Sequence, residues 1–381
     1  MKKLAIVGAS YLQNPLIEKA KKRGIETHVF AWQSDDIGEK TADYFYPISI
    51  IEKEAILSKC KEIGIDGICS IASDLASITV NYVADKMNLI GNSLESVELS
   101  TNKHQMRKCF EREGDPSPKS FLVETLSDLQ SVSIDFPVIV KPVDRSGSRG
   151  ITKVNSNDAL GDAIEYAKSQ GFDKSVLVEE FVTGDEYSVE FISWKGKHHF
   201  LALTQKYTTG APNFIETGHL QPAMVPQDIL EKVICVVTHA LDSLGIQYGA
   251  SHSELKISQD GMIRLIEIGG RMGGDFIGSH LVEMSTGIDF VSAVIDIALG
   301  IEPKFTKTEN SVAMVRFVLE QKDADILEEL SEQKSELIVE RDVHEITSEH
   351  VKDSSARFGY YILKANSLQE LTDYLPERTR E

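Results

Sequence analysis

Cysteine is scarce in this sequence, and its few copies lie far apart. Cys60, Cys69, Cys109 and Cys235 include no CxxC pair and no Cys/His spacing of the kind that holds zinc. The pattern therefore favours neither a disulfide framework nor a structural zinc site. We expect reduced, buried thiols in a cytoplasmic protein.

Long apolar runs are also missing. No stretch approaches the roughly 20 apolar residues that span a bilayer, so we expect no membrane segment. Residues 1–10, MKKLAIVGAS, carry two lysines before a short apolar run, as a signal peptide does. The run breaks at Gly8 and a charged amphipathic stretch follows, so a first β-strand is the better interpretation.

Positive charge is the third deficit. Lys and Arg number 40 against 59 Asp and Glu, which gives a formal net charge of −19. Nucleic-acid binding calls for clustered Lys and Arg that neutralise phosphates, and this chain shows no such cluster. We therefore expect small molecules, and not nucleic acid, as binding partners.

The first 95 residues or so alternate between strand and helix patterns. The 381 residues, 41% of them hydrophobic, can bury a core large enough for two or three domains. Strands are predicted at 4–8, 26–31 and 66–71, and helices at 15–23, 52–63 and 75–88. This order is typical of a doubly wound α/β unit.

A dinucleotide fingerprint is absent from that unit. The first turn reads GASYLQNP and lacks the GxGxxG spacing that lets a backbone approach a pyrophosphate. A nicotinamide-dependent dehydrogenase is therefore disfavoured, and the unit is interpreted as a Rossmann-like scaffold without its own cofactor.

The rest of the chain follows a different pattern. A helix near 102–114 leads to DPSPKSF (115–121), whose two prolines suggest a domain boundary. Short strands rich in Val, Ile and Phe then extend to about residue 300, with helices near 156–170 and 227–244. After Pro303 we expect strands near 311–320 and 358–365 and helices near 324–333 and 367–375.

A first candidate site lies in PVIVKPVDRSGSRG (137–150). Lys141 ends an apolar strand, and Ser146, Gly147 and Ser148 follow in a loop. Such a loop can cover phosphates, because glycine allows close backbone approach, hydroxyls donate hydrogen bonds and lysine adds a positive charge. A solvated turn is the alternative interpretation of this segment alone.

A second candidate site lies in VLVEEFVTGDEYSVEF (176–191), which reads as two strands with a short connection. A charged hairpin is one interpretation and an adenosine clamp is the other. In the clamp, backbone groups around Glu180 and Val182 read the adenine edge, Phe181 packs on the ring, and Glu186 accepts from ribose hydroxyls. Glu179 belongs to the same candidate set.

A third candidate site is the hairpin at 251–271, which turns at Asp260-Gly261. Glu254 and Glu267 are expected to face each other across its two strands. Paired carboxylates suit Mg2+ that bridges phosphates, and like charges opposite each other are otherwise destabilising. Arg271 follows four residues later in a glycine-rich turn.

These three sites, in this order and at these separations, resemble the ATP-grasp superfamily, and the resemblance covers nearly the whole chain. It implies a Rossmann-like domain at 1–100, an ATP-grasp domain at 101–303 with a lid at about 115–182, and a small α+β subdomain at 304–381. Within TNKHQMRK (101–108), Lys103 matches the family lysine that approaches the nucleotide phosphates. The resemblance also implies that Lys141 holds the α- and β-phosphates and Glu186 the ribose.

The sequence departs from the family at one metal-site position. Many members read Glu-x-Asn-x-Arg there, whereas this chain has Gly269 between Glu267 and Arg271. That departure resembles the L-amino acid ligases, as does the Gly-His-x-x-Pro stretch at 218–222. Only Glu254 and Glu267 are therefore predicted as metal ligands.

The remaining predicted residues concern the substrate. His219 is a candidate for the substrate pocket, although a lone histidine is more often structural. Gly273 and Gly274 are predicted to line the same pocket. Arg271 is predicted to hold the substrate carboxylate and the oxyanion of the tetrahedral intermediate, and Lys141 to neutralise charge on the transferring phosphoryl group.

The function that the resemblance implies is ATP-dependent ligation of a carboxylate to an amine through an acyl phosphate, with ATP and Mg2+, or Mn2+ in its place, as cofactors. The substrates would be amino acids or small metabolites. Three alternatives remain open: carboxyphosphate chemistry on bicarbonate, a purine-pathway ligase, and a regulatory module that binds nucleotide without turnover. A homodimer is the default expectation for soluble enzymes of this kind.

Overall fold

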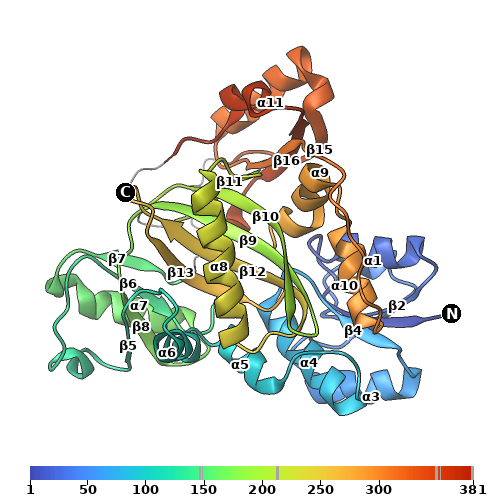
Figure 1. Ribbon diagram of the computed structural model, residues 1–381, viewed down its shortest axis with the longest axis horizontal. Helices are drawn as coiled ribbons and strands as arrows, with labels where there is room; N and C mark the ends of the chain where they lie inside the picture. The colour runs from blue at the N-terminus through green and yellow to red at the C-terminus, as the bar shows by residue number, and fades with distance from the viewer. Residues whose placement is uncertain (146, 148, 212–213, 348–350, 352, 379–381) are drawn as a thin grey trace.

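The computed structural model describes residues 1–145, 147, 149–211, 214–347, 351 and 353–378. Three sheets organise the described chain (Figure 1): a four-stranded sheet in the order β3-β2-β1-β4, an eight-stranded sheet in the order β13-β12-β9-β10-β11-β14-β16-β15, and a four-stranded sheet in the order β5-β8-β6-β7. The fold class predicted from the sequence, mixed α/β and α+β with a Rossmann-like start, is confirmed.

The N-terminal sheet is parallel and carries helices on both faces. Its strands are β1 (Lys3–Val7), β2 (Glu26–Ala31), β3 (Tyr44–Pro47) and β4 (Gly67–Cys69), and its helices are α1 (Asn14–Lys22), α2 (Ile37–Thr41), α3 (Lys53–Ile63) and α4 (Asp74–Met87). The short edge strand β3 was not predicted. It is defined by its pairing with β2 and not by a pattern in its own sequence. Local signals set the helix ends: the Ser73 hydroxyl accepts from the Ala76 N–H at the start of α4, and Gly64 ends α3 in the left-handed conformation.

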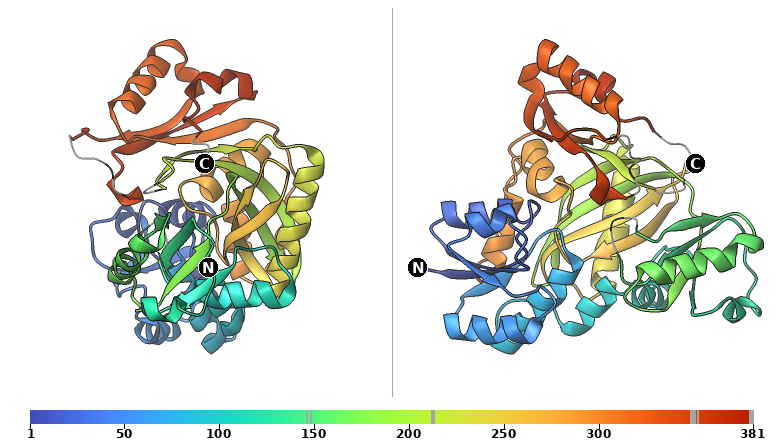
Figure 2. Two further views of the ribbon diagram at one scale, coloured as in Figure 1. Left: turned by 90° about the vertical axis from the view of Figure 1, so that its left-hand side faces the viewer. Right: turned by 180° about the vertical axis from the view of Figure 1, so that it is seen from behind.

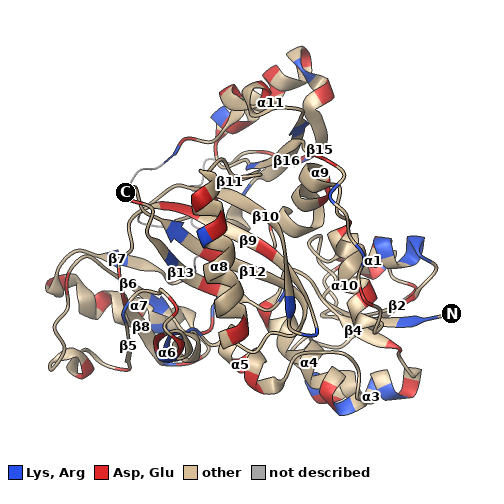
Figure 3. Cartoon of the chain, viewed as in Figure 1, with Lys and Arg blue, Asp and Glu red and all other residues tan. Residues whose placement is uncertain are grey.

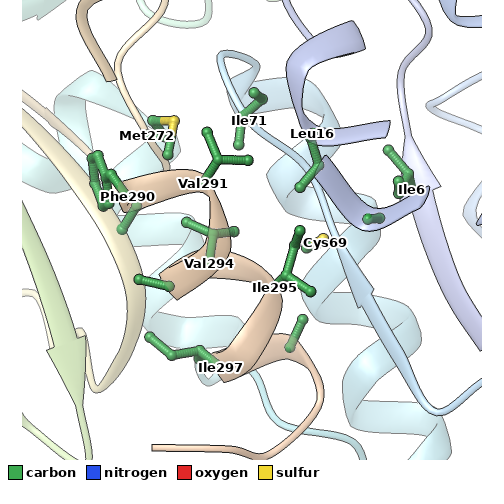
Figure 4. Packing of buried hydrophobic residues seen from close by; sticks show 14 of the residues in the cluster. Ile6, Leu16, Cys69, Ile71, Met272, Phe290, Val291, Val294, Ile295 and Ile297 are labelled. Carbon is green, nitrogen blue, oxygen red and sulfur yellow. The ribbon is translucent and has the colours of Figure 1, made fainter. Parts of the chain in front are cut away.

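A helix from far along the chain completes this unit. Side chains alternate across β1, so that Leu4 and Ile6 join one core while Ala5 and Val7 join another. The first core is closed by α10 (Phe290–Ala298), as Figure 4 shows. Gly67 makes the close approach possible, since a Cβ there would lie 2.3 Å from the Ala298 carbonyl oxygen. The Rossmann-like unit is therefore fixed to the rest of the chain by its own core.

The eight-stranded sheet is antiparallel and forms the centre of the molecule. Its first five strands are β9 (Asp185–Trp194), β10 (Lys197–Thr208), β11 (Glu216–Gln221), β12 (Tyr248–Ile257) and β13 (Ile263–Gly269). The helices α6 (Lys103–Glu113) and α8 (Gln227–Ser243) cover one face through Phe110, Val237 and Leu241. The helix α5 (Leu94–Thr101) precedes α6, and η3 (Ile277–Leu281) and α9 (Val282–Thr286) follow β13.

The third sheet forms a separate lobe, green in Figures 1 and 2. It consists of β5 (Ser120–Val123), β6 (Val138–Pro142), β7 (Thr152–Val154) and β8 (Val176–Glu180), all paired antiparallel. The helix α7 (Leu160–Gln170) packs on it through Leu160 and Ile164. Two 3-10 turns, η1 (Leu126–Leu129) and η2 (Asn157–Ala159), complete the lobe.

The C-terminal segment extends the large sheet. β14 (Val312–Phe317), β16 (Gly359–Ala365) and β15 (Ile338–Val343) add to it in that order, and α11 (Gln321–Gln333) packs on them, shown in orange and red in Figure 2. Short 3-10 turns lie at η4 (Ser335–Leu337) and η5 (Ser354–Ala356).

Two expectations about this segment are wrong. In place of the helix predicted at 367–375, the chain forms two 3-10 turns, η6 (Leu368–Glu370) and η7 (Thr372–Tyr374). Leu371 and Tyr374 are both buried and three residues apart, which suits three residues per turn. The strand β15 was missed because Glu340, Arg341 and Asp342 give this edge strand a charged sequence.

The surface agrees with the composition in most respects. Charges of both signs are interspersed on the surface helices, as on α3 in Figure 3. Within the described part of the chain, no helix is long and apolar enough to cross a membrane. Cys60, Cys69 and Cys109 are buried thiols as predicted, but Cys235 is exposed, because it lies on the solvent-facing side of α8.

Candidate active site

One cleft gathers the residues that the sequence singled out. It has a volume of about 330 Å³. Its walls are formed by residues of the lobe sheet, of the large sheet and of loops in the N-terminal unit. The predicted residues on its wall are Lys103, Lys141, Gly147, Glu179, Glu180, Phe181, Val182, Glu186, His219, Glu254, Glu267, Arg271 and Gly274. Ser146 and Ser148 lie outside the described residues, and Gly273 lies just behind the wall. Three stretches far apart in sequence therefore form one site.

Lys141 is held between the lobe sheet and helix α6. Its Nζ lies 2.6 Å from Oε2 of Glu179 on the neighbouring strand β8, and Nε of Arg107 lies 2.9 Å from Oε1 of the same carboxylate. All three side chains are almost fully buried. Burial alone would raise the pKa of Glu179, but the charges of Arg107 and Lys141 outweigh it and hold the pKa at about 2.

Lys103 joins the same region from the first position of α6. Asn102 starts this helix by accepting from the N–H groups of His104 and Gln105. Nζ of Lys103 then donates to Oε1 of Glu267 at 2.6 Å and to the Arg145 carbonyl at 2.8 Å.

We call this set the cationic group, and it consists of Lys103, Arg107, Lys141, Glu179 and Glu267. Three cations share two carboxylates in it. The group therefore has a surplus of positive charge, which suits an anion such as phosphate.

Glu254 and Glu267 face each other across β12 and β13, as predicted. The expected repulsion between them is relieved without a metal, because a lysine lies beside each carboxylate. Lys206 lies 2.5 Å from Glu254, and Lys103 lies 2.6 Å from Glu267. Like-charge repulsion alone is therefore no evidence for a metal in this protein.

The two carboxylates nonetheless fit a divalent cation. Both line the cleft, and carboxylate oxygen is the ligand that Mg2+ prefers. Among the described residues, no group of three or more His, Cys, Asp or Glu side chains is poised to hold a metal by itself. Mg2+ usually binds through one or two carboxylates together with substrate phosphates, so Glu254 and Glu267 are sufficient for a site that forms with the nucleotide.

Lys206 on β10 is the centre of a second charged set that the sequence analysis missed. Its Nζ lies 2.5 Å from Glu254, 3.2 Å from Glu186 and 3.9 Å from Glu216. Burial alone would lower the pKa of Lys206, but these carboxylates raise it well above its usual value. The sequence offered little indication that Lys206 belongs to the site. A lysine within a β-strand such as ALTQKYT is equally typical of an exposed edge strand.

The same set continues to the C-terminal segment through Arg357. Its guanidinium lies 2.9 Å from Glu216 and 2.7 Å from Asp275, and it stacks 3.7 Å above the Phe317 ring. We call Lys206, Arg357, Glu186, Glu216, Glu254 and Asp275 the acidic group. Two cations share four carboxylates in it, so the group has a surplus of negative charge.

His219 is buried beside the acidic group. Its Nε2 lies 3.8 Å from Oδ2 of Asp275, while its Nδ1 has no hydrogen-bond partner among the described residues. Burial lowers the pKa of His219, and Asp275 offsets this only in part. The imidazole is therefore neutral at neutral pH, and it lies where a substrate-pocket residue was predicted.

His252 and Glu190 support the acidic group from behind. Burial opposes protonation of His252, but hydrogen bonding to the buried Glu190 raises the pKa of the imidazole to about 9. Nε2 of His252 lies 3.4 Å from Glu254, and the Gly273 N–H donates to Glu190 at 3.0 Å. A Cβ at Gly273 would lie 2.6 Å from Nδ1 of His252, so this position requires glycine.

Arg271 is oriented by a partner that was not predicted. Its Nε and Nη2 donate to Oδ1 and Oδ2 of Asp74 at 2.8 and 2.9 Å, a bidentate pair at the start of α4. Asp74 follows strand β4 at the carboxyl end of a parallel sheet, where doubly wound folds place functional residues, and this position was the available signal.

The ion pair between Arg271 and Asp74 also explains why position 269 is a glycine and not the asparagine found in many members of the family. A Cβ there would lie 2.9 Å from Oδ1 of Asp74 and 3.1 Å from Nε of Arg271. The Asp74 carboxylate therefore occupies the space where an asparagine side chain would begin.

Phe181 and Glu186 lie on the remaining wall of the cleft. The Phe181 ring has Nζ of Lys153 at 3.8 Å and Nζ of Lys256 at 5.2 Å from its centroid. Glu186, at the start of β9, contacts Lys206. An aromatic surface and a carboxylate thus both line the cleft, and the adenosine clamp stays a prediction.

Comparison with known proteins gives a family match in this region. Residues 134–279 match the model described as ATP-grasp domain. The alanine--anticapsin ligase of Bacillus subtilis (strain 168) is 26% identical over 297 residues, covering 69% of this chain and 62% of that protein. The chain thus spans about three fifths of the length of the curated relatives that match it in this way.

Two solved structures show the same fold. The L-amino acid ligase from Bacillus licheniformis has a TM-score of 0.84 and 22% identity, covering 98% of this chain and 96% of that one. The biotin carboxylase domain dimer of the Hydrogenobacter thermophilus 2-oxoglutarate carboxylase, solved with MgADP, ADP and bicarbonate, has a TM-score of 0.78 and 18% identity, covering 98% and 88%. The similarity in fold therefore extends beyond the matched domain to almost the entire chain.

Proposed function

We propose that the chain belongs to the ATP-grasp superfamily and is an ATP-dependent carboxylate–amine ligase that forms an amide through an acyl phosphate. The cleft with its cationic and acidic groups is the proposed active site. Curated relatives that are ligases and share this domain support the proposal.

The single observation that carries the proposal is the opposite charge surplus of the two groups in one cleft. Three buried cations share two carboxylates in the cationic group, which suits the phosphates of ATP. Glu254 and Glu267 would hold Mg2+, or Mn2+ in its place, and the ion would supply positive charge that stabilises the transferring phosphoryl group. The biotin carboxylase relative solved with MgADP supports this choice.

In the proposed reaction, an oxygen of the substrate carboxylate attacks the γ-phosphorus of ATP, and the bond to the β-phosphate oxygen breaks. ADP leaves, and an acyl phosphate forms. Lys141 and Lys103 neutralise phosphate charge during this step, and Arg271, held by Asp74, stabilises the carboxylate and the later oxyanion.

The amide forms in the second step. A neutral amine attacks the acyl carbon, phosphate leaves with the electron pair of its C–O bond, and the amine proton passes to solvent. No serine or cysteine nucleophile is needed, because phosphate is already a good leaving group.

Substrate-dependent ADP release tests the proposal. Purified protein with ATP and Mg2+ would be screened against pairs of amino acids and small carboxylates, with coupled detection of ADP and mass spectrometry of the product. We expect stoichiometric ADP and amide for at least one pair. Tight ATP binding without substrate-dependent ADP release would instead favour a regulatory nucleotide-binding module.

The proposal includes the domain division at residues 100 and 303, a cytoplasmic location and a homodimer. The strands after residue 303 share the large sheet with β11, so the last division is one of sequence and not of separate sheets. Sedimentation velocity measures the oligomeric state directly.

A further inference from the structure

The acidic group contains two carboxylates that the proposed chemistry does not use, Glu216 and Asp275, and Asp275 is the one that lies beside the predicted substrate residue His219. Asp275 lies four residues beyond Arg271 and lines the cleft, as do the apolar residues Leu12, Ala72 and Ile277. Its Oδ2 contacts Arg357 at 2.7 Å and His219 at 3.8 Å. Both contacts that the structure records for this carboxylate are made by Oδ2, and the carboxylate itself lines the cleft.

The charge around Asp275 is not balanced. Arg357 is shared between Asp275 and Glu216, so one cation faces two carboxylates. Burial keeps His219 neutral by lowering its pKa, so the imidazole adds no positive charge. Lys206 does not balance the surplus either, because it is shared by three carboxylates, one of them Glu216.

A second observation indicates a ligand at the same place. His219 is only 1% exposed and lines the cleft, yet its Nδ1 has no hydrogen-bond partner among the described residues. A buried polar atom without a partner is costly and calls for a ligand or ordered water. His219, whose Nδ1 is unpaired among the described residues, and the Asp275 carboxylate thus lie 3.8 Å apart in the wall of the cleft.

On the basis of the proposed function, we infer that Asp275 binds the ammonium group of the carboxylate substrate, so that the donor acid is an amino acid and not a simple acid or bicarbonate. An ammonium group supplies the positive charge that Arg357 and Lys206 leave missing. The apolar side chains of Leu12 and Ile277 line the same cleft and suit the carbon skeleton of such a substrate.

The ammonium is assigned to the donor and not to the acceptor for a chemical reason. The acceptor nitrogen must be uncharged when it attacks the acyl phosphate. A neighbouring carboxylate favours the charged ammonium form and would suppress that attack. The donor keeps its ammonium throughout, so a carboxylate partner helps its binding without cost to the reaction.

Matched donors test the inference. Alanine, lactate and propionate, and the corresponding sets for larger side chains, share a carbon skeleton and differ in the ammonium group. Amino acid amides serve as acceptors, since their blocked carboxyl prevents them from acting as donors. We expect ADP release with amino acid donors and at least about 10-fold lower kcat/KM with hydroxy and desamino acids, the size of one charge-assisted hydrogen bond.

The variant Asp275→Asn should remove that preference. Asn keeps the size and tolerates the positive φ of 48° at this position. We expect the KM for the amino acid to rise roughly 10-fold to 100-fold, with the KM for ATP unchanged. The matched control is Asp35→Asn, an exposed aspartate that also has a positive φ, of 61°.

Calorimetry separates this inference from the proposed function. The protein is saturated with a non-hydrolysable ATP analogue and titrated with alanine, lactate and propionate, and with the corresponding sets. Ammonium-dependent binding that is lost in Asp275→Asn supports the inference even if no ADP is released, an outcome that would refute the ligase proposal alone. ADP release at equal rates with all three donor types, or an unchanged preference in Asp275→Asn, would refute the inference and leave the ligase proposal standing.

Discussion

The cationic and acidic groups are built from the same residue types, yet they leave opposite charges uncompensated. In the cationic group, Arg107 and Lys141 share Glu179, whereas in the acidic group Lys206 alone is shared by three carboxylates. Lys206 and, in the cationic group, Lys103, Arg107, Lys141 and Glu179 are buried, where charge is screened less than at the surface, whereas the other carboxylates of both sets are partly exposed in the cleft. The difference teaches that the ratio of acids to bases, and not the presence of ion pairs, tells which ligand each part of the cleft suits.

Removal of Lys206 should break the acidic group most severely. Lys206→Met leaves Glu186, Glu216 and Glu254 without their shared cation, and loss of one partner from a buried ion pair typically costs about 3–5 kcal/mol. Urea denaturation measures the loss. Lys197→Met, at an exposed position of the same strand β10, is the matched control and should change stability by less than about 0.5 kcal/mol.

The corresponding change in the cationic group is Glu179→Gln. It leaves Lys141 and Arg107 buried without a counter-charge, and we expect a loss of about 3 kcal/mol, because the amide still offers an oxygen. Glu180→Gln, its exposed neighbour, is the control. Equal stability of the two variants would show that the buried charges are compensated by other groups.

The pH dependence of the same variant sharpens the comparison. The folded-state pKa of Glu179 is about 2, below the unfolded value of about 4.3. Its stabilisation is therefore fully present above the unfolded pKa and is lost as the pH falls through the folded pKa. We expect the difference in unfolding free energy between wild type and Glu179→Gln to narrow between about pH 4 and pH 2. A difference that stays constant over this range would contradict the assigned pKa.

Arg271 lies between the two groups, and its substitution should affect the chemical step. Arg271→Lys removes the bidentate fork that Asp74 orients, and we expect kcat to fall roughly 100-fold, as for the loss of one electrostatic donor. The affinity for ATP should barely change. Steady-state kinetics with the identified substrate pair measures both, and near-normal turnover would show that Arg271 is structural only.

Asp74 provides a test that a merely structural role would not pass. Asp74→Asn keeps a side-chain oxygen but loses half of the charge-assisted bidentate pair. If Asp74 positions Arg271, kcat should fall about 10-fold while the KM for ATP stays unchanged. An equal change in both constants, together with a lower melting temperature, would indicate a general loss of structure.

The sequence predicted the parts of the site that depend on local pattern. The Asp260-Gly261 turn set the hairpin register, so Glu254 and Glu267 were expected to face each other, and they do. Lys141 could be placed at the end of an apolar strand for the same reason. Ion pairs between residues far apart in the sequence had no such signal. Three cations, Arg107, Lys206 and Arg357, reach the cleft from α6, β10 and the C-terminal segment. The periodicity of a sequence does not indicate which carboxylate each of these cations will contact.

The fold was predictable to a similar extent. Alternating strands and helices indicated the N-terminal parallel sheet. The packing of α10 onto that unit depends instead on contacts between segments far apart in the sequence, such as those of α10 with α1 and β4. The missed strand β15 exists because β16 pairs with it, and its own charged sequence does not indicate a strand.

Calorimetric titration of two variants with a non-hydrolysable ATP analogue tests the central claim, the division of the cleft between phosphate and substrate, most directly. Lys141→Ala removes a cation from the cationic group, and Asp275→Asn removes an acid from the acidic group. We expect Lys141→Ala to weaken binding of the analogue by roughly 10-fold or more and Asp275→Asn to bind it like wild type. Unchanged affinity in Lys141→Ala, or an equal loss in both variants, would contradict the division.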